Sequence, residues 1–319
     1  MTLPEPGAPA FTRRAPSVPW QWVKLVGFGV LTVVVIAAMR NVDWRKTAAA
    51  LHDAKPGWLL IAVVANAAIL PCWAMFWRTL RSRGEQDVSF ARMLEITSIS
   101  SALMNTLPFG GGHASAVVLL IKRGNTTQRG ALSVLALDQL GEGVLKVAVL
   151  VFAALVVPLP TWMRAALTTV LVVVGAWLLT LVVVSRMTSE LEVLRNFRRS
   201  SAALAFVAGT KLAELAAIIS VQAAYGVRVP LAGSVLVLAT VILATMLPIS
   251  PGNLGAYEAS VFLVYRYLGV APELALSLAI VQHVCFMIPA VGVGYSFFTV
   301  NGLGWRAILP ARRASGRAR

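Results

Sequence analysis

Ionisable side chains interrupt the most apolar stretches of the chain, and their spacing is the first sign of chemistry. Asp138, Glu142 and Lys146 recur at intervals of four residues, so on a helix each is displaced by only about 40° and all three share a face. Such groups are costly at membrane depth and typically mark a substrate or ion path. Lys146 can neutralise Glu142 and leave Asp138 for a substrate; a self-neutralising pair that only packs helices is the alternative.

Other polar residues in apolar stretches allow the same two interpretations. Lys211 and Glu214 are three residues apart, share a helix face and are interpreted first as a structural pair. Glu258 and His283 lie in two later stretches and are candidates for substrate contact, as is His113, which follows three glycines. For each histidine, a hydrogen-bonded packing role is an equal alternative.

The chain has no arrangement that predicts a metal centre, a cofactor or catalysis. Its three histidines are dispersed, and Cys72 and Cys285 lie singly in apolar runs, so we expect neither a metal-ligand cluster nor a disulfide framework. There is no zinc-ligand pair, Gly-x-Ser-x-Gly elbow or Walker motif. His113 and Ser115 follow the glycines, but residues two apart on a helix point about 200° away from each other. We expect no enzyme, no metal and no cofactor.

Two Leu-Pro breaks, each followed by glycine, interrupt the apolar runs. Residues 103–119 read LMNTLPFGGGHASAVVL, and residues 243–259 read LATMLPISPGNLGAYEA. Downstream, ALSVLALDQ at 131–139 resembles ALSLAIVQH at 275–283, which makes the likeness an internal repeat. Proline ends or kinks each helix, glycine permits the turn, and the following helix begins with free N–H groups that attract an anion. Broken helices at matching positions indicate a transporter's binding site; two structural kinks are the alternative.

Long apolar segments must position these residues. The chain is 58% hydrophobic and 13% charged, unlike soluble proteins, and several segments reach the roughly 20 residues that cross a membrane. Segments 93–107 and 113–121 are too short to cross alone, which predicts a re-entrant hairpin. The segments are about 23–39, 57–77, 93–107, 113–121, 131–157, 162–185, 202–224, 231–247, 252–268 and 275–299.

We therefore predict an all-α fold, a polytopic transmembrane helical bundle with about eight spans and two broken-helix, re-entrant hairpins. Three crossings separate the hairpins, and because three is odd, the hairpins should enter from opposite sides as an inverted repeat. The repeat halves are about 90–157 and 230–299, within a single membrane domain at 20–300. A disordered cytoplasmic tail at 1–19 and a basic tail at 301–319 flank this domain.

The basic charge indicates how the chain is oriented. The net charge of +15 comes from Lys and Arg in short loops and tails, which is typical of the positive-inside bias and not of nucleic-acid binding. Alternating the loops places most of the 28 Lys and Arg on the side that holds both termini. We expect a multi-pass protein of the bacterial cytoplasmic (inner) membrane with both termini in the cytoplasm.

Residues near the ends of segments have simpler expected roles. Trp58 and Trp77 lie near span ends and are expected to anchor the helices at the membrane interface. Glu95 lies near the cytoplasmic end of its helix and is expected to be solvated. Asn105 and Asn253 flank the two breaks and are candidates to cap helices.

The motifs at the breaks are similar to those of a known family. LPISPGNLGAYEASVFLVYRYLGV, followed by A-x-x-L-A-x-x-Q-H in the next span, resembles the C-terminal signature of the lysylphosphatidylglycerol synthase transmembrane-region family, also called flippase-like domain proteins. LPFGGGHASAVVLLIKRG and the span with Asp138 resemble the first-half motif. The family's acidic residue after the glycines is missing here, and Asp138-Gln139 stands where Glu-Arg is common.

The resemblance covers roughly residues 20–300 and implies lipid handling or flipping. It also makes Glu258 a recurrent position of the family. Bifunctional members carry a soluble aminoacyl-transferase domain, for which the basic tail from Arg306 to Arg319 leaves no room. Synthesis of lysyl-lipid is therefore not implied.

These observations favour a lipid flippase or transporter for a phospholipid or a lipid-linked anionic headgroup. Its partners would be membrane lipids, with a soluble lipid-biosynthetic enzyme as a further candidate. The alternatives are a scaffold for a lipid-modifying enzyme of a lysyl-phospholipid or hopanoid pathway, and an intramembrane lipid-modifying enzyme. The residues assigned to the substrate path are Pro108, Gly110, Gly112, His113, Asp138, Glu142, Pro248, Pro251, Gly252, Asn253, Gly255, Glu258 and His283.

Overall fold

The computed structural model describes residues 43–81, 86–107, 111–156, 196–245 and 250–302, and separate residues between 164 and 180. Over these ranges the regular structure is helical throughout, as predicted. In chain order the helices are α2 Trp44–His52, α3 Pro56–Ala67, α4 Ile69–Leu80, α5 Phe90–Thr106, α6 Gly111–Arg123, α7 Gln128–Val156, α10 Phe197–Ala224, α11 Leu231–Thr245, η2 Pro251–Asn253, α12 Ala256–Tyr267 and α13 Pro272–Val300.

Four helical stretches of the described chain are long and apolar enough to cross a membrane. The first comprises α3 and α4, which are separated at Ala68 because Pro71 has no N–H to donate to the carbonyl of the preceding turn. Large apolar side chains remain exposed on these helices, for example Leu155 at 81%, which suits a lipid solvent. The chain is therefore a multi-pass membrane protein, while the predicted spans 23–39 and 162–185 lie wholly or mostly outside the described residues. The four stretches are Pro56–Leu80, Gln128–Val156, Phe197–Ala224 and Pro272–Val300.

The first Leu-Pro break separates α5 from α6, which fold back on each other. At the start of α5 the side chain of Ser89 accepts a hydrogen bond from the N–H of Arg92, which caps the helix. Gly112 lies directly against the α5 backbone, where an added Cβ would be 2.4 Å from the Cα of Met104. Glycine at this position is therefore what lets the two helices touch.

The second break separates α11 from α12 and contains the short helix η2, which Pro251 opens. Gly252, Asn253 and Gly255 have φ angles of 60°, 56° and 85°, a region that glycine and asparagine enter most readily. Glu258, in the first turn of α12, accepts a hydrogen bond of 2.7 Å from the N–H of Gly255 and so caps that helix. The helix break predicted in this segment is therefore present.

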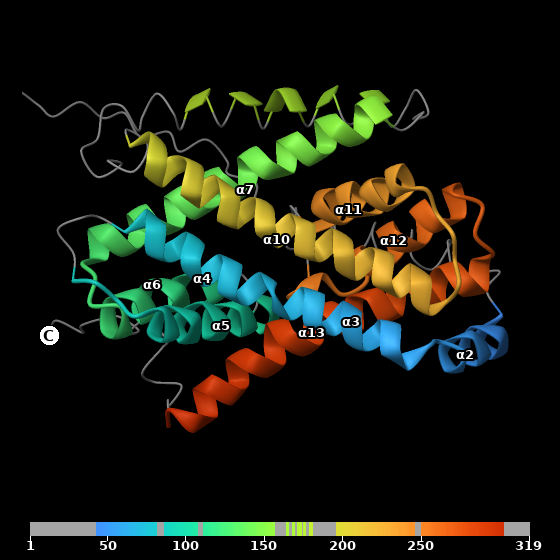
Figure 1. The fold of residues 1–319 in the computed structure, drawn as a ribbon, viewed down its shortest axis with the longest axis horizontal. Coiled ribbons are helices and arrows are strands. Elements are labelled where there is room, and N and C mark those ends of the chain that lie inside the picture. Colours follow the sequence, from blue (N-terminus) through green and yellow to red (C-terminus); the bar gives the residue numbers. More distant parts are fainter. Residues whose placement is uncertain are drawn as a thin grey trace, which may run out of the picture.

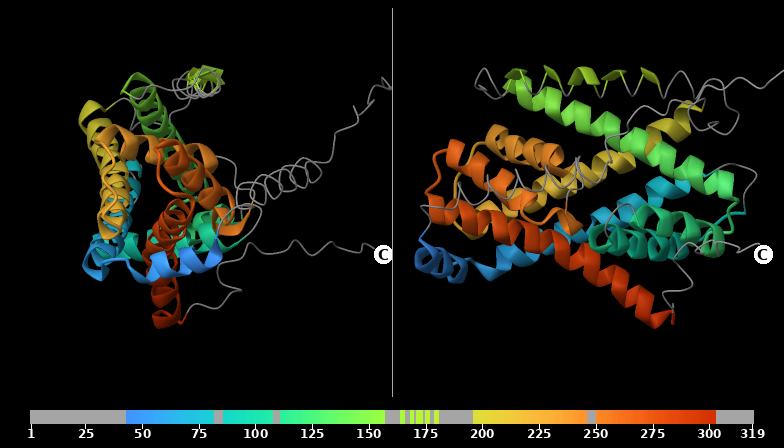
Figure 2. Two further views of the ribbon diagram at one scale, coloured as in Figure 1. Left: turned by 90° about the vertical axis from the view of Figure 1, so that its right-hand side faces the viewer. Right: turned by 180° about the vertical axis from the view of Figure 1, so that it is seen from behind.

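The two broken pairs lie in opposite halves of the molecule. Figure 1 shows α5 and α6 in the left half and α11 and α12 in the right half, and Figure 2 shows the same division from behind. The breaks approach each other between the halves, because a Cβ on Gly252 would be 3.2 Å from the carbonyl oxygen of Asn105. Helix α13 crosses α5 at Gly294, where an added Cβ would lie 2.2 Å from the carbonyl oxygen of Ser98.

Two apolar cores occupy the two halves, and the long helices pass from one to the other. The first core packs α4, α5 and α6 against the beginnings of α7 and α10, and the second packs α11, α12 and α13 against their ends. Along α7 the first core ends at Leu140 and the second begins at Leu150; along α10 the corresponding residues are Val207 and Ala217. The helix segments between these residues form a layer midway along the spans.

The stretch before α3 contains a helix that the hydropathy pattern does not indicate. Helix α2 begins after Asp43, whose carboxylate accepts hydrogen bonds of 3.0 and 3.3 Å from the N–H groups of Arg45 and Lys46. The hydroxyl of Ser277 in α13 donates to the carbonyl of Thr47 at 3.2 Å. This contact holds α2 against one end of α13.

Candidate functional site, a charged cavity between the two breaks

A cavity of about 220 Å³ lies in the layer between the two apolar cores. Its wall is built by α4, α5, α7, α10, α11, η2, α12 and α13, so both broken pairs and all four candidate spans contribute. The apolar part of the wall comprises Ile69, Trp73, Met104, Val241, Ile242 and Phe286, with Gly252 between them. The polar part comprises Ser101, Asn105, Glu142, Lys146, Thr210, Lys211, Glu214, Thr245, Asn253, Tyr257 and His283.

Four charged side chains form one network across the cavity wall. The Nζ atom of Lys211 lies 3.3 Å from an Oε atom of Glu142 and 3.2 Å from one of Glu214. Lys146 Nζ lies 3.7 Å from the same Glu142 oxygen. The pairings within each helix confirm the spacing arguments. The bridge from Lys211 to Glu142 joins α10 to α7, a contact that spacing within one helix could not predict.

Glu258 and His283 form a second polar pair, of which His283 lines the cavity. His283 Nδ1 lies 2.7 Å from Glu258 Oε1, and because a carboxylate only accepts, Nδ1 carries the proton. The imidazole ring is also stacked on the ring of Tyr257, with centroids 4.2 Å apart and an interplanar angle of 13°. The sequence indicated each residue separately; the structure joins them.

A chain of buried hydrogen bonds leads away from Tyr257 into the second core. Gln282 Nε2 donates to the Tyr257 hydroxyl at 2.8 Å, and the Tyr265 hydroxyl donates to Gln282 Oε1 at 3.3 Å. Gln222 Nε2 in turn donates to Tyr265 at 3.1 Å, and Ser234 donates to Gln222 Oε1 at 2.8 Å. Every link donates toward Tyr257, so none of these hydrogen bonds uses the hydrogen of the Tyr257 hydroxyl.

Asp138 is near the cavity but does not line it. Its carboxylate is buried and accepts hydrogen bonds of 2.8 Å from the Trp73 indole, 2.7 Å from the Trp77 indole and 3.2 Å from the Gln139 amide. Trp73 stands in the cavity wall, so Asp138 lies behind it. The interfacial role expected of Trp77 is wrong, because this side chain is fully buried and bonded to Asp138.

The glycine-rich turn of the first half does not bring its candidate residues into the cavity wall. Gly112 packs against α5, and His113 is exposed. Ser115 is buried and donates to the carbonyl of Gly111 at 2.9 Å, so it faces away from His113, as helix geometry predicts. Pro108, Gly110 and Pro248 lie outside the described residues. In the second half, Gly252 and Asn253 line the cavity, whereas Pro251 and Gly255 shape the turn beside it.

Glu95 is not solvated, contrary to expectation. Its side chain is 8% exposed and pairs with Arg92 at 2.6 Å and with Arg123 at 2.8 Å. Because Arg123 is the last residue of α6 and Glu95 belongs to the first turns of α5, this ion pair ties together the open end of the first broken pair.

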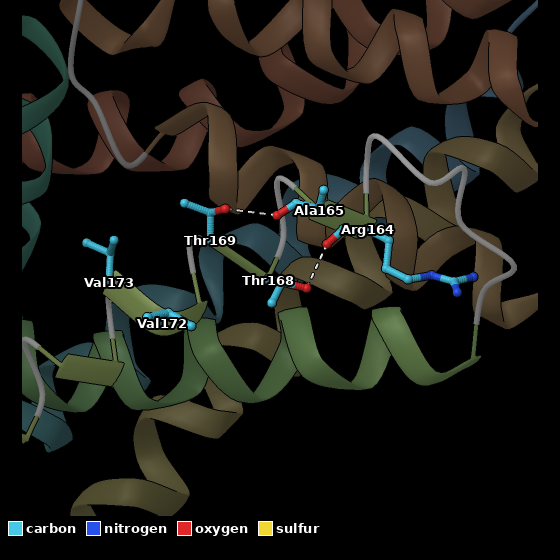
Figure 3. Close-up of a pocket in the computed structure, with 6 residues that line it drawn as sticks. All are labelled: Arg164, Ala165, Thr168, Thr169, Val172 and Val173. Carbon is cyan, nitrogen blue, oxygen red and sulfur yellow. Dashed lines mark hydrogen bonds between the residues drawn. The ribbon is translucent and has the colours of Figure 1, made fainter.

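A larger hollow of about 620 Å³ does not have the character of a site. Figure 3 shows that its six described lining residues all come from the short segment 164–173. The hydroxyls of Thr168 and Thr169 donate back to the carbonyls of Arg164 and Ala165 at 2.8 and 3.0 Å. No second described element faces these groups, so nothing converges on a ligand.

Comparison with known proteins shows the family of this chain. The family model described as the lysylphosphatidylglycerol synthase TM region matches residues 24–294. A UPF0104 membrane protein from Methanothermobacter thermautotrophicus is 27% identical over 313 residues, covering 83% of this chain and 92% of that protein. The matched region contains both breaks and every described residue that lines the cavity. The chain therefore belongs to the lysylphosphatidylglycerol synthase TM region family.

Proposed function

We propose that this protein moves a phospholipid, or another lipid with an anionic headgroup, across the membrane, and that the central cavity holds the headgroup. The observation that carries the proposal is a charged cavity enclosed where two broken helices meet, midway along the spans. Ionised groups at this depth are costly and persist where they serve a polar substrate. We infer an anionic headgroup because Lys146 and Lys211 line the cavity and either lysine could exchange its contact with Glu142 for a phosphate.

The two broken pairs support an alternating-access mechanism. We propose that α5–α6 and α11–α12 are the halves of an inverted repeat that enter the membrane from opposite sides. Each pair belongs to its own apolar core, and the pairs touch through Gly252 and Asn105 at their breaks. Rocking of one half against the other would open the cavity to each side in turn.

The size of the cavity sets which part of a lipid it can hold. A volume of about 220 Å³ is below the usual range for a drug-sized ligand, so it suits a compact headgroup and excludes acyl chains. The chains would remain in the bilayer beside the exposed apolar faces. Inside the cavity a phosphate would contact one of the two lysines, Lys146 or Lys211, in place of Glu142. Glu142 would keep the other lysine, so no charged group would be left without a partner of opposite charge.

The orientation is also proposed from the charges. Arginines gather where α4, α5, α6, α7 and α10 meet at one end of the described bundle, and this end would face the cytoplasm. We also propose, from the loop charges of the sequence, that both termini lie in the cytoplasm and that the membrane is the bacterial cytoplasmic membrane. The residues concerned are Arg78, Arg81, Arg92, Arg123, Arg129, Arg198 and Arg199.

An intramembrane enzyme is the second candidate, and the Glu258–His283 pair is the observation that favours it. A carboxylate that orients an imidazole is an arrangement used in general base catalysis. Such a base needs a nucleophile beside its second nitrogen. No described hydroxyl lies within hydrogen-bonding distance of His283 Nε2, so transport accounts better for the site.

Reconstituted vesicles test the proposed transport. A fluorescent anionic phospholipid is quenched from outside, and the rate at which the inner leaflet becomes accessible is measured. We expect purified protein to raise the rate, and Lys146→Met to lower it by at least about tenfold, the loss of one charge-assisted contact. In this variant Glu142 keeps Lys211 at 3.3 Å, so folding should be preserved.

The matched control is Lys46→Met, which removes an exposed lysine paired with Asp43 on α2. Its rate should stay within about twofold of the wild-type rate. Equal rates with wild-type protein and with protein-free vesicles would exclude lipid movement. If Lys146→Met moved lipid as fast as the control variant, the cavity would take no part in transport.

A further inference from the structure

Two polar atoms of residues that line the cavity, His283 Nε2 and Asn253 Oδ1, are buried without a partner among the described residues, and of the two only the histidine nitrogen can bind a proton. His283 is only 2% exposed, and no described donor or acceptor lies within hydrogen-bonding distance of its Nε2 atom. Its other nitrogen is bonded to Glu258, which does not line the cavity. The Nε2 side of the ring is therefore the side left for whatever enters the cavity.

The surroundings of His283 fix how the ring binds a proton. Glu258 holds Nδ1–H, so a neutral ring presents a lone pair at Nε2, and the same carboxylate stabilises the imidazolium that forms when Nε2 takes a proton. Glu258 is itself held by the N–H of Gly255, and the ring is held by Tyr257. Proton binding therefore requires no rearrangement of the pair.

Binding of that proton changes the total charge at the cavity by one unit. On α7 and α10 the charges of Glu142, Lys146, Lys211 and Glu214 cancel, while α5 and α11 contribute uncharged lining residues. Helix α3 has no ionisable residue. On α12, Tyr257 and Tyr265 are buried and Glu258 is half-buried, whereas Arg266 and Tyr267 are exposed. Counted over Glu142, Lys146, Lys211, Glu214 and Glu258, the charge is −1 with neutral His283 and zero with protonated His283. Asp138 behind Trp73 and His113, which interacts with Lys146, are outside this sum. Protonation of His283 therefore makes the cavity one unit more positive, and an anion is accepted more readily in that state.

We propose that Nε2 of His283 is a proton-binding site of the cavity and that the protein carries one proton together with each anionic headgroup. The coupling rests on the proposed function, whereas the proton site does not. Reciprocity requires that the headgroup raise the affinity for the proton by the same factor as the proton raises the affinity for the headgroup. Transport would then follow a proton gradient across the membrane.

The first experiment observes the proton site directly. The chain has three histidines, so protein containing ¹⁵N-histidine in lipid nanodiscs gives three ring signals, which His52→Gln, His113→Gln and His283→Gln assign. We expect the His283 signal to be the Nδ1–H tautomer and, over a titration from about pH 9 to pH 5, to gain the Nε2 proton. A His283 ring that stays neutral throughout, or one protonated at Nδ1 and Nε2 throughout, would overturn the site.

The second experiment tests the coupling. Vesicles with a pH-sensitive dye inside are given a pH difference of one unit, and lipid movement and proton entry are followed together. For wild type we expect proton entry only with the anionic lipid present, and lipid asymmetry of up to about tenfold, the ratio that one proton sustains per pH unit. His283→Gln can still donate to Glu258 but cannot titrate, and it should lose both responses.

The control is His52→Gln, at the exposed end of α2, which should behave as wild type. Lipid movement by wild type without proton entry would exclude coupling and leave the transport function intact, as would undiminished proton entry with His283→Gln. No lipid movement by wild type would refute the transport function and the coupling, and the histidine titration would then decide the proton site alone. Unchanged thermal unfolding of His283→Gln separates these outcomes from misfolding.

Discussion

At the scale of single residues, buried polar groups are distinguished by whether the protein itself satisfies them. Asp138 accepts three hydrogen bonds from neighbouring side chains, which makes it a structural acceptor within the fold. His283 Nε2 has no described partner, and His283 lines the cavity. This difference could not be inferred from the sequence. The spacing of Asp138 from Glu142 and Lys146 makes Asp138 a stronger candidate for substrate contact than His283.

Removing one donor to Asp138 should destabilise the protein. Trp77→Phe keeps the buried ring area but deletes the indole N–H that lies 2.7 Å from the carboxylate. We expect a loss of about 1–3 kcal/mol in the free energy of unfolding, because a buried acceptor loses its partner. Trp58→Phe, at the exposed start of α3, should change stability by less than about 0.5 kcal/mol. Equal thermal unfolding of the two variants in detergent would contradict this account of Asp138.

The charge network allows a second residue-scale prediction. Lys211→Met leaves Glu142 and Glu214 close together without their shared cation, and breaking a buried pair in this way costs about 3–5 kcal/mol. Adding Glu142→Gln should restore part of that stability, since one uncompensated charge disappears. The check is the unfolding transition of the single and double variants. A double variant less stable than Lys211→Met would show that Glu142 is stabilised by other groups.

At the scale of elements, small residues set how closely the helices pack, because lipid provides no hydrophobic drive between them. Gly112 lets α6 lie on α5, and Gly294 lets α13 cross α5. The sequence predicted both breaks and, apart from α2, the described helices to within about five residues, for example 131–157 for α7 (Gln128–Val156), because these depend on local hydropathy and on proline. It did not predict the crossing at Gly294, which depends on a partner almost 200 residues away.

Two glycines of α13 provide a matched test of that crossing. Gly294→Ala would place a Cβ 2.2 Å from the carbonyl oxygen of Ser98, whereas Gly292→Ala would meet nothing within 4 Å. We expect Gly294→Ala to cost about 1–3 kcal/mol or more through overpacking, and Gly292→Ala to be neutral or to add up to about 1 kcal/mol through helix propensity. The thermal unfolding temperatures of the two variants, compared with that of the wild type, test this expectation. Equal stabilities would mean that α13 and α5 can separate without loss.

At the scale of the whole molecule, the two halves and the layer between them explain why the site was only partly predictable. Residues such as Glu258 and His283 were identifiable because ionisable groups are rare in apolar segments. Their pairing, and the bridge from Lys211 to Glu142, required knowledge of which helices are neighbours. Tyr257 was missed altogether, although it directly precedes Glu258, because a tyrosine in an apolar helix carries no distinguishing signal.

The inverted repeat can be tested by labelling single cysteines. In a background without Cys72 and Cys285, Gln128→Cys marks the open end of α5–α6 and Ala271→Cys marks the open end of α12; both positions are exposed. We expect a membrane-impermeant maleimide to reach them from opposite sides of intact cells and inverted vesicles, since hairpins of an inverted repeat open to opposite sides. Labelling from the same side would refute the inverted repeat.

The separation of the two apolar cores has a consequence for cooperativity. Leu140 and Leu150 on α7 belong to different cores, and Glu142 and Lys146 between them line the polar cavity. Each half should therefore be a cooperative folding unit of its own, and one half could unfold while the other stays folded. Amide hydrogen exchange should report two protection levels, one for each core, with the fastest exchange along the backbone that joins them. The boundary between the two cores, where the halves would move against each other during transport, is therefore also where we expect local unfolding to begin.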